Sequence, residues 1–337
     1  MIRQSQWSRD RQRLRSRDQA IYFWRYMKLM WEIGRREMLI AAFMILITGL
    51  APILMTVFLR GLIDGAVGIL KGDSNLTTAT IWLVAFLAAN LVQALSGIFV
   101  HRWLIPDIME IFQAGVNERL MIKASRLPLE AFEQAEYYDL LHHAQFGVDR
   151  LWVPIQWMLR IPSDAITAIG LLIYLGSVNI WFPVILLIGI TPSHVIGERI
   201  FERIRVLKSK HSPTLRYIDY LGKLMADRPA AAEVRLFGLG DFLLGRRKKL
   251  VAELRNDRLS LARERVRGAV ARTFFEHFTY ALVITWSVVL IVTGRLTLGL
   301  FAAFLTAAQQ FMSSASMALG GYRSVTGSIS YMKDVLD

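Results

Sequence analysis

Six long apolar runs, separated by short turns or by strongly basic stretches, constrain the fold of this chain more than any other feature. A helix of about 20 apolar residues crosses a hydrocarbon core of about 30 Å. Because lipid offers no partners for backbone N–H and C=O groups, such runs are expected to be helical. The sequence therefore predicts an all-α membrane protein with six transmembrane helices. The predicted spans are about 38–67, 78–100, 153–178, 180–196, 274–292 and 298–319.

Lysine and arginine are distributed unevenly between these runs. Residues 1–37 hold ten, residues 101–152 hold five and residues 197–273 hold nineteen, whereas the turns at 64–77 and 293–297 hold one each. Basic residues near span ends stay on the cytoplasmic side. The pattern predicts a multi-pass protein of the cell membrane with both termini and both long connections in the cytoplasm.

Composition excludes several classes of chemistry. The chain has no cysteine, which rules out disulfides, thiolate metal sites and cysteine nucleophiles in these residues. Its histidine, aspartate and glutamate residues show no metal-ligand spacing, and no catalytic set is recognisable. The net charge of +13 follows the membrane topology, which disfavours binding of nucleic acid.

The glycines near residue 240 raise the question of a phosphate-binding loop. Gly240 and Gly245 have the spacing of the first two glycines of a P-loop, but Arg246 and Arg247 stand where the lysine and hydroxyl residue are needed. No buried strand leads into the segment. The glycines instead predict a turn that ends a short helix, AAAEVRLF, before a long helix returns toward the membrane.

The two long cytoplasmic connections, about 101–152 and 197–273, are predicted to extend the spans as helical hairpins. An amphipathic stripe at helical spacing supports this for the second connection. Its residues are Leu243, Leu244, Arg247, Leu250, Val251, Leu254, Arg258, Leu261 and Arg265. Residues 1–37 combine a basic tail with an amphipathic segment, on which Trp24, Met27, Met30 and Trp31 can share a face. Two interpretations of that segment stay open: an elbow helix lying in the membrane interface, or a helix packed on the cytoplasmic loops.

Charged residues within the spans are costly in lipid and usually face a cavity or a partner. Arg160 and Asp164 share a face of the third span, either lining a translocation path or forming a structural pair. Arg60 and Asp64 repeat this spacing near the outer end of the first span, where a role as an outer gate is expected.

The order of these features, together with four local motifs, resembles the transmembrane domain of type I ABC exporters across essentially the whole chain. SRLPLEAFEQAEYYDLLHHA (125–144) resembles the first intracellular loop of that family, and AAAEVRLFGLGDFLLGR (230–246) resembles the second. GRLTLGLFAAFLTAAQQF (294–311) and SISYMKDVLD (328–337) resemble the start and the end of the sixth helix. The second loop is also reminiscent of peptide and lantibiotic exporters.

The resemblance implies two coupling helices that dock on a nucleotide-binding domain. The residues that match the first coupling helix are Glu136, Tyr137, Tyr138, Asp139 and Leu140. Those that match the second are Glu233, Val234, Arg235, Leu236, Phe237 and Gly238. For the apolar and aromatic members, packing back onto their own hairpin is the alternative.

The resemblance also implies partners outside these residues. They are a second copy of the transmembrane domain and a nucleotide-binding domain that binds ATP and Mg²⁺. No Walker A, Walker B or signature motif occurs before Asp337, so the ATPase domain is expected either later in a longer chain or on a separate chain. The leading interpretation of the sequence is the membrane domain, 38–337, of a half-transporter.

Two other functions remain as alternatives. A secondary transporter or channel is disfavoured because the spans show neither paired broken segments nor an internal repeat. A membrane scaffold that binds a cytoplasmic partner without transport would share the fold. The sequence does not identify the substrate.

Overall fold

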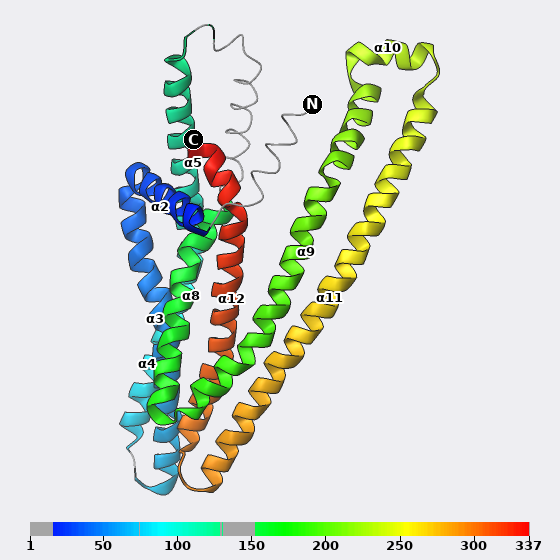
Figure 1. Cartoon of the computed structure of the whole chain (residues 1–337). Coiled ribbons are helices and arrows are strands. Elements are labelled where there is room, and N and C mark those ends of the chain that lie inside the picture. The colour runs from blue at the N-terminus through cyan, green and yellow to red at the C-terminus, as the bar shows by residue number, and fades with distance from the viewer. Residues whose placement is uncertain (1–15, 74, 129, 131–151, 337) are drawn as a thin grey trace. The chain divides into compact units, whose positions relative to one another are not determined.

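Helices make up all the secondary structure in the part of the chain that the computed structural model describes, residues 16–73, 75–128, 130 and 152–336 (Figure 1). The all-α fold class is thereby confirmed for these residues. In chain order the helices are α2 (Ser16–Ile33), α3 (Arg35–Lys71), α4 (Leu76–Phe99), the π-helical turn η1 (Val100–Leu104), α5 (Ile105–Ser125), α8 (Trp152–Val178), α9 (Trp181–Ala226), α10 (Arg228–Leu236), α11 (Gly240–Val292) and α12 (Leu298–Leu336).

Five helical stretches in the described residues are long and apolar enough to cross a membrane. They contain the first five predicted spans and are Arg35–Lys71, Leu76–Ser125, Trp152–Val178, Trp181–Ile204 and Gly240–Val292. The sixth predicted span lies in α12, which is not one of the five. Gln309, Gln310 and a group of serines make α12 more polar, so the sixth span stays a prediction.

The described chain divides into two compact units, of which the first comprises Met1–Leu186 and Leu282–Asp337. Within it α12 packs along α8 and α3, and α3 packs along α4 and α8. The buried stripe of α12 includes Ala303, Phe304, Ala307, Ala308 and Phe311. Protein rather than lipid covers this stripe. The polar residues Gln309 and Gln310 of α12 lie outside it.

Helices α12 and α8 approach closely at Gly321. A Cβ atom at this position would lie 2.6 Å from Trp157 Cε3 and 2.7 Å from Ile161 Cγ1. The neighbouring Gly320 has open space at the corresponding point. Gly321 is therefore the residue at which a side chain would force the two helices apart.

The N-terminal helix α2 packs its Tyr26 and Met30 into the core of this unit. Tyr26 meets Phe112 of α5 edge to face, with ring centroids 5.2 Å apart, and burial raises the pKa of the Tyr26 hydroxyl well above its usual range. Trp24 and Trp31 are exposed instead. Met30 thus differs in exposure from the two tryptophans expected on its face, and both interpretations of the segment stay predictions.

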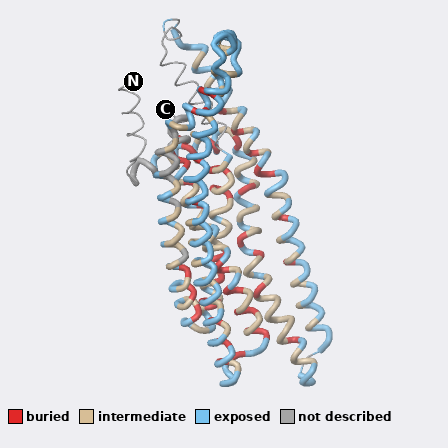
Figure 2. Tube along the Cα trace, turned by 90° about the vertical axis from the view of Figure 1, so that its right-hand side faces the viewer, coloured by how far each residue is buried: buried red, intermediate tan, exposed pale blue. Residues whose placement is uncertain are grey.

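Apolar side chains also cover much of the outer surface of α3. Leu39, Phe43, Leu46, Leu50 and Leu54 follow one another at helical spacing, and each is roughly half exposed. Figure 2 shows buried positions spaced along the helices, with exposed stretches between them. An exposed apolar stripe of this length suits contact with hydrocarbon better than contact with water.

The second unit, Leu187–Ala281, contains most of α9, all of α10 and most of α11. Arg203 of α9 and Glu264 of α11 form an ion pair at 2.8 Å. On α11, Leu243, Leu254 and Leu261 are buried and Leu250 is half-buried, as predicted. Leu244 and Val251 of the predicted stripe are exposed, so the buried stripe is narrower than the sequence suggested.

The tip of this hairpin is the short helix α10, with Pro229 in its first turn (Figure 1). The Leu239 N–H donates to the Val234 carbonyl at 2.9 Å, which closes the C-terminal end of α10. Gly238 has φ 60°, a left-handed conformation that glycine adopts without strain. The chain therefore reverses between α10 and α11.

Replacing Gly321 with alanine is expected to lower the stability of the protein by about 1–3 kcal/mol, because the added methyl group collides with Trp157 and Ile161. Gly320→Ala is the matched control and should be neutral or slightly stabilising, since alanine favours helix. Thermal unfolding in detergent or nanodiscs measures both. Equal melting temperatures for the two variants would contradict the close contact.

Candidate functional site

The glycine-rich segment after α10 does not form a phosphate-binding loop. Gly240 is the first residue of α11, and Gly245 lies inside that helix. The backbone N–H groups after the first turn are therefore committed to helical hydrogen bonds rather than free to cradle a phosphate. This segment thus offers no site for ATP, in agreement with the sequence.

The residues matched to the second coupling helix lie at the exposed tip of the second unit. Leu236 is 80% exposed and Phe237 is 67% exposed, while Val234 is half-buried. Glu233 and Arg235 are exposed beside them. At this exposure neither side chain is covered by its own hairpin, and the docking role of both stays a prediction.

The residues matched to the first coupling helix, Glu136 to Leu140, lie outside the described residues. Their assignment stays a prediction.

Arg160 and Asp164 form an ion pair on α8, with Arg160 Nε 3.3 Å from Asp164 Oδ2. The Asp164 side chain is 17% exposed, and the Arg160 guanidinium lies 5.9 Å from the centre of the Trp157 ring. The pair is therefore half sheltered, and each charge has a partner of opposite sign. The two interpretations given above, path and structural pair, are compatible with this contact.

A cavity of about 170 Å³, lined by both polar and apolar side chains, adjoins this ion pair within the first unit. Helices α3, α4, α8 and α12 and the turn η1 contribute to its wall. Its polar side chains are Thr48, Gln93, His101, Arg160, Ser163, Asp164, Thr167 and Ser314. Sequence reasoning found only Arg160 and Asp164. It missed Ser163 and Thr167 of the same helix, whose side chains carry no charge, and Thr48, Gln93, His101 and Ser314, which come from distant parts of the chain.

The π-helical turn η1 forms part of the cavity wall. Val100, His101 and Leu104 of this turn line the cavity. A π turn inserts one extra residue per turn and changes which side chains face inward, and such turns often occur at functional sites. The sequence analysis did not predict this turn, although His101 and Arg102 mark the end of the apolar run at this point.

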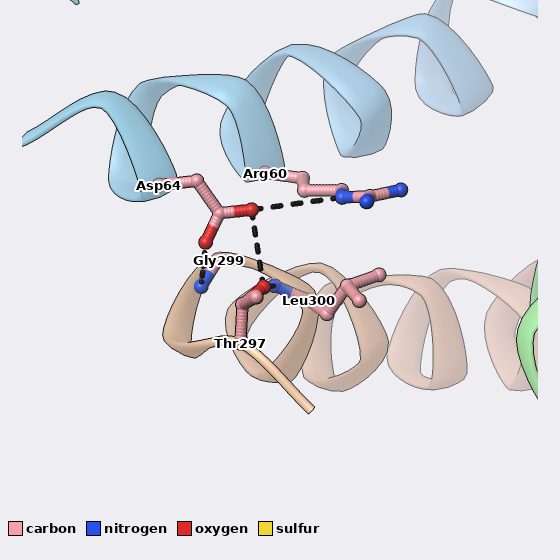
Figure 3. A network of polar contacts seen from close by, with 5 residues as sticks. All are labelled: Arg60, Asp64, Thr297, Gly299 and Leu300. Carbon is pink, nitrogen blue, oxygen red and sulfur yellow. Dashed lines mark hydrogen bonds and ion pairs between the residues drawn. The ribbon is translucent and has the colours of Figure 1, made fainter. Parts of the chain in front are cut away.

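Arg60 and Asp64 of α3 form a second polar network, with the start of α12 (Figure 3). Arg60 Nε lies 3.6 Å from Asp64 Oδ2. Asp64 accepts a hydrogen bond from the Thr297 hydroxyl at 3.1 Å and one from the Gly299 N–H at 2.9 Å. The Leu300 N–H donates to the Thr297 hydroxyl at 3.2 Å.

Asp64 thereby caps the first turn of α12 from another helix. Helix N-termini leave N–H groups without partners and attract negative charge. Gly299 permits the approach, because a Cβ atom there would lie 2.5 Å from the Arg60 carbonyl oxygen and from Asp64 Cγ. The sequence singled out Arg60 and Asp64 but missed Thr297 and Gly299, although a threonine just before a helix is a capping signal.

The comparisons with known proteins give one distant relative. No known protein-family model matches the chain. The chain is 21% identical over 278 residues to the nisin transport ATP-binding protein NisT of Lactococcus lactis subsp. lactis. The aligned region covers 81% of this chain and 44% of NisT, so the chain spans less than half of its relative. This distant similarity and the apolar helices fit a transmembrane domain of an ABC exporter.

Asp64→Ala is expected to destabilise the protein by about 1–3 kcal/mol, because it removes the two hydrogen bonds that hold α12 to α3. Asp73→Ala, which removes an exposed carboxylate just after α3, is the control and should change little. Thermal unfolding measures both, and hydrogen exchange of the Gly299 amide locates the effect. An unchanged exchange rate at Gly299 in Asp64→Ala would contradict the capping contact.

Proposed function

We propose that residues 1–337 are the membrane-spanning half of an ATP-driven ABC exporter and form its substrate translocation pathway. The similarity to NisT over most of the chain supports the transport class. The five membrane-length helices and the exposed apolar stripe of α3 support a multi-pass membrane protein. In this proposal α12 supplies the sixth span, and both termini and the α10 tip lie in the cytoplasm.

The motor of the proposed exporter lies outside these residues. A nucleotide-binding domain, in the same polypeptide or on a separate subunit, binds ATP and Mg²⁺. NisT is named as an ATP-binding protein and extends beyond the aligned region, which supports this arrangement. Two copies of the transmembrane domain pair in the bilayer. The name of the relative also favours a peptide substrate of the lantibiotic type.

The observation that carries the proposal is the exposure of Leu236 and Phe237 at the tip of the second unit. Aromatic side chains such as Phe237 are enriched in the cores of protein interfaces, where they serve as anchors. The tip is flanked by α9, with 46 residues, and α11, with 53, both of which are continuous into membrane-length segments. Docking of α10 on a nucleotide-binding domain would therefore transmit ATP-driven movement to the spans.

Within the membrane, Arg160 and Asp164 are proposed to line the translocation path. Their ion pair borders the cavity, which supports this role over a purely structural one. Arg60 and Asp64 are proposed as an outer gate. Their network joins α3 to the start of α12, so its rupture would free the outer ends of the two helices to separate.

Phe237→Asp is expected to abolish ATP-driven movement while leaving the fold intact, because it places a charge in the apolar docking contact. The whole protein carries a spin label at Asp73→Cys in the proposed outer turn. Electron-electron distance measurements compare the separation of two labels in nanodiscs before and after addition of ATP with vanadate. Tyr220→Asp, which adds the same charge at an exposed aromatic residue of α9, is the control and should keep the movement.

Three results would contradict the proposal. The first is that no distance between two labels can be measured. The second is that ATP with vanadate does not change this distance in the protein without a further substitution. The third is that Phe237→Asp shows the same change in distance as that protein.

A further inference from the structure

The cavity beside Arg160 and Asp164 is built within a single copy of the chain. Every residue of its wall belongs to the first unit, from α3, α4, η1, α5, α8 and α12. Its volume of about 170 Å³ exceeds by roughly tenfold the space that one water molecule needs. The cavity can therefore accept several waters or a polar group of a few heavy atoms without a partner subunit.

The hydroxyl groups of the cavity wall show mainly acceptor sites. Thr167 donates its proton to the Gly49 carbonyl at 2.8 Å. The Thr48 hydroxyl lies 2.8 Å from the Met44 carbonyl and 2.8 Å from the Ser163 hydroxyl. Protons engaged in this way leave oxygen lone pairs available to a ligand.

Gln93 adds an acceptor that nothing in the described part of the chain satisfies. Its Oε1 atom is buried and has no hydrogen-bond partner among the described residues, although the side chain lines the cavity. An unsatisfied buried oxygen is costly, and a ligand with an N–H or O–H group removes that cost. At Gln93 the wall therefore offers an acceptor to a ligand, whereas the Arg160 guanidinium, a donor in the same wall, is already paired with Asp164.

The charges of the wall argue against an ionic ligand. Asp164 is already paired with Arg160, so the two formal charges cancel. An ammonium or carboxylate group entering the cavity would lose its hydration without gaining an unpaired countercharge. An uncharged donor suffers no such loss.

From these observations we propose that the cavity is a binding subsite for an uncharged hydrogen-bond-donating group, an amide or a hydroxyl, of an amphipathic molecule. The inference rests on the proposed function in one respect: in a transporter, this subsite would define the chemical class of the substrate. The binding step itself requires neither ATP nor a second copy. Gln93 accepts the donor, and the hydroxyls of Thr48, Ser163 and Thr167 contribute further acceptors.

Cysteine labelling tests the subsite, because residues 1–337 contain no cysteine. Ser314→Cys places a thiol in the cavity wall of the whole protein in nanodiscs, with any cysteine outside these residues replaced by serine. Its reaction rate with the uncharged reagent methyl methanethiosulfonate is followed by mass. Asp73→Cys is the exposed reference, Leu50→Cys is the lipid-facing reference, and Thr48→Cys replaces Ser314→Cys if the latter fails to fold.

Four probes with the same ten-carbon chain distinguish the ligand chemistry: decanamide, decanol, decylamine and decanoate. We expect decanamide and decanol to slow labelling of Ser314→Cys by about tenfold, as for two hydrogen bonds. Decylamine and decanoate should have little effect once rates are normalised to Asp73→Cys. The relative strength of decanamide and decanol then separates an amide, as in a peptide, from a hydroxyl, as in a lipid.

Gln93→Leu should remove most of the protection, by about fivefold for one hydrogen bond. Gln310→Leu is the matched control, because Gln310 also has an Oε1 without a described partner but does not line the cavity. The proposal is overturned if Ser314→Cys reacts as slowly as Leu50→Cys, if all four probes protect equally, or if both glutamine variants behave alike. Because no ATP is used, a failure here leaves the proposed export function standing, and a failure of ATP-driven movement leaves the subsite standing.

Discussion

The hydrogen-bond demand of the backbone in lipid is the constraint on which the rest of this structure depends. Each N–H and C=O group inside a bilayer needs a partner in the chain itself, and a continuous helix supplies it. Helices α9 and α11 satisfy that demand across their membrane-length parts and then continue without a break toward α10. The same continuity that makes these helices compatible with lipid also makes them stiff connections.

Polar side chains face a related constraint, since a charge in the membrane needs a partner of its own. Asp64 is held by Arg60, Thr297 and Gly299, and Asp164 is held by Arg160. The contacts of Asp64 and those of Asp164 have different structural effects. The Asp64 network ties α3 to α12 through a helix N-terminus, whereas the Arg160–Asp164 pair stays on one helix and borders a cavity.

Much of the fold could be predicted from local sequence. The first five apolar runs lie in membrane-length helices, and Gly238 ends α10 in the expected left-handed conformation. Local pattern also located Arg60 with Asp64 and Arg160 with Asp164, because residues four apart share a helix face. The sixth predicted span stays a prediction, because α12 contains polar residues and is not among the membrane-length helices. Helix α12 packs along α8 and α3.

What the sequence could not provide depends on contacts between distant segments. Thr297 reaches Asp64 across 233 positions of the chain, and Gly321 matters only because α8 presents Trp157 there. The burial of Tyr26 in α2 likewise depends on a distant segment, since its ring packs against Phe112 of α5. The π turn at His101 was also not predicted, although Pro106 follows it in the first turn of α5.

Photocross-linking from position 237 tests the central claim most directly. A photoreactive phenylalanine analogue replaces Phe237 in the natural membrane, and mass spectrometry identifies the peptides joined to it. The account predicts adducts with an ATP-binding domain, in the same polypeptide, its second copy or a separate subunit. Adducts confined to α9 and α11, or to lipid, would show that the α10 tip does not dock on a motor and would contradict the account.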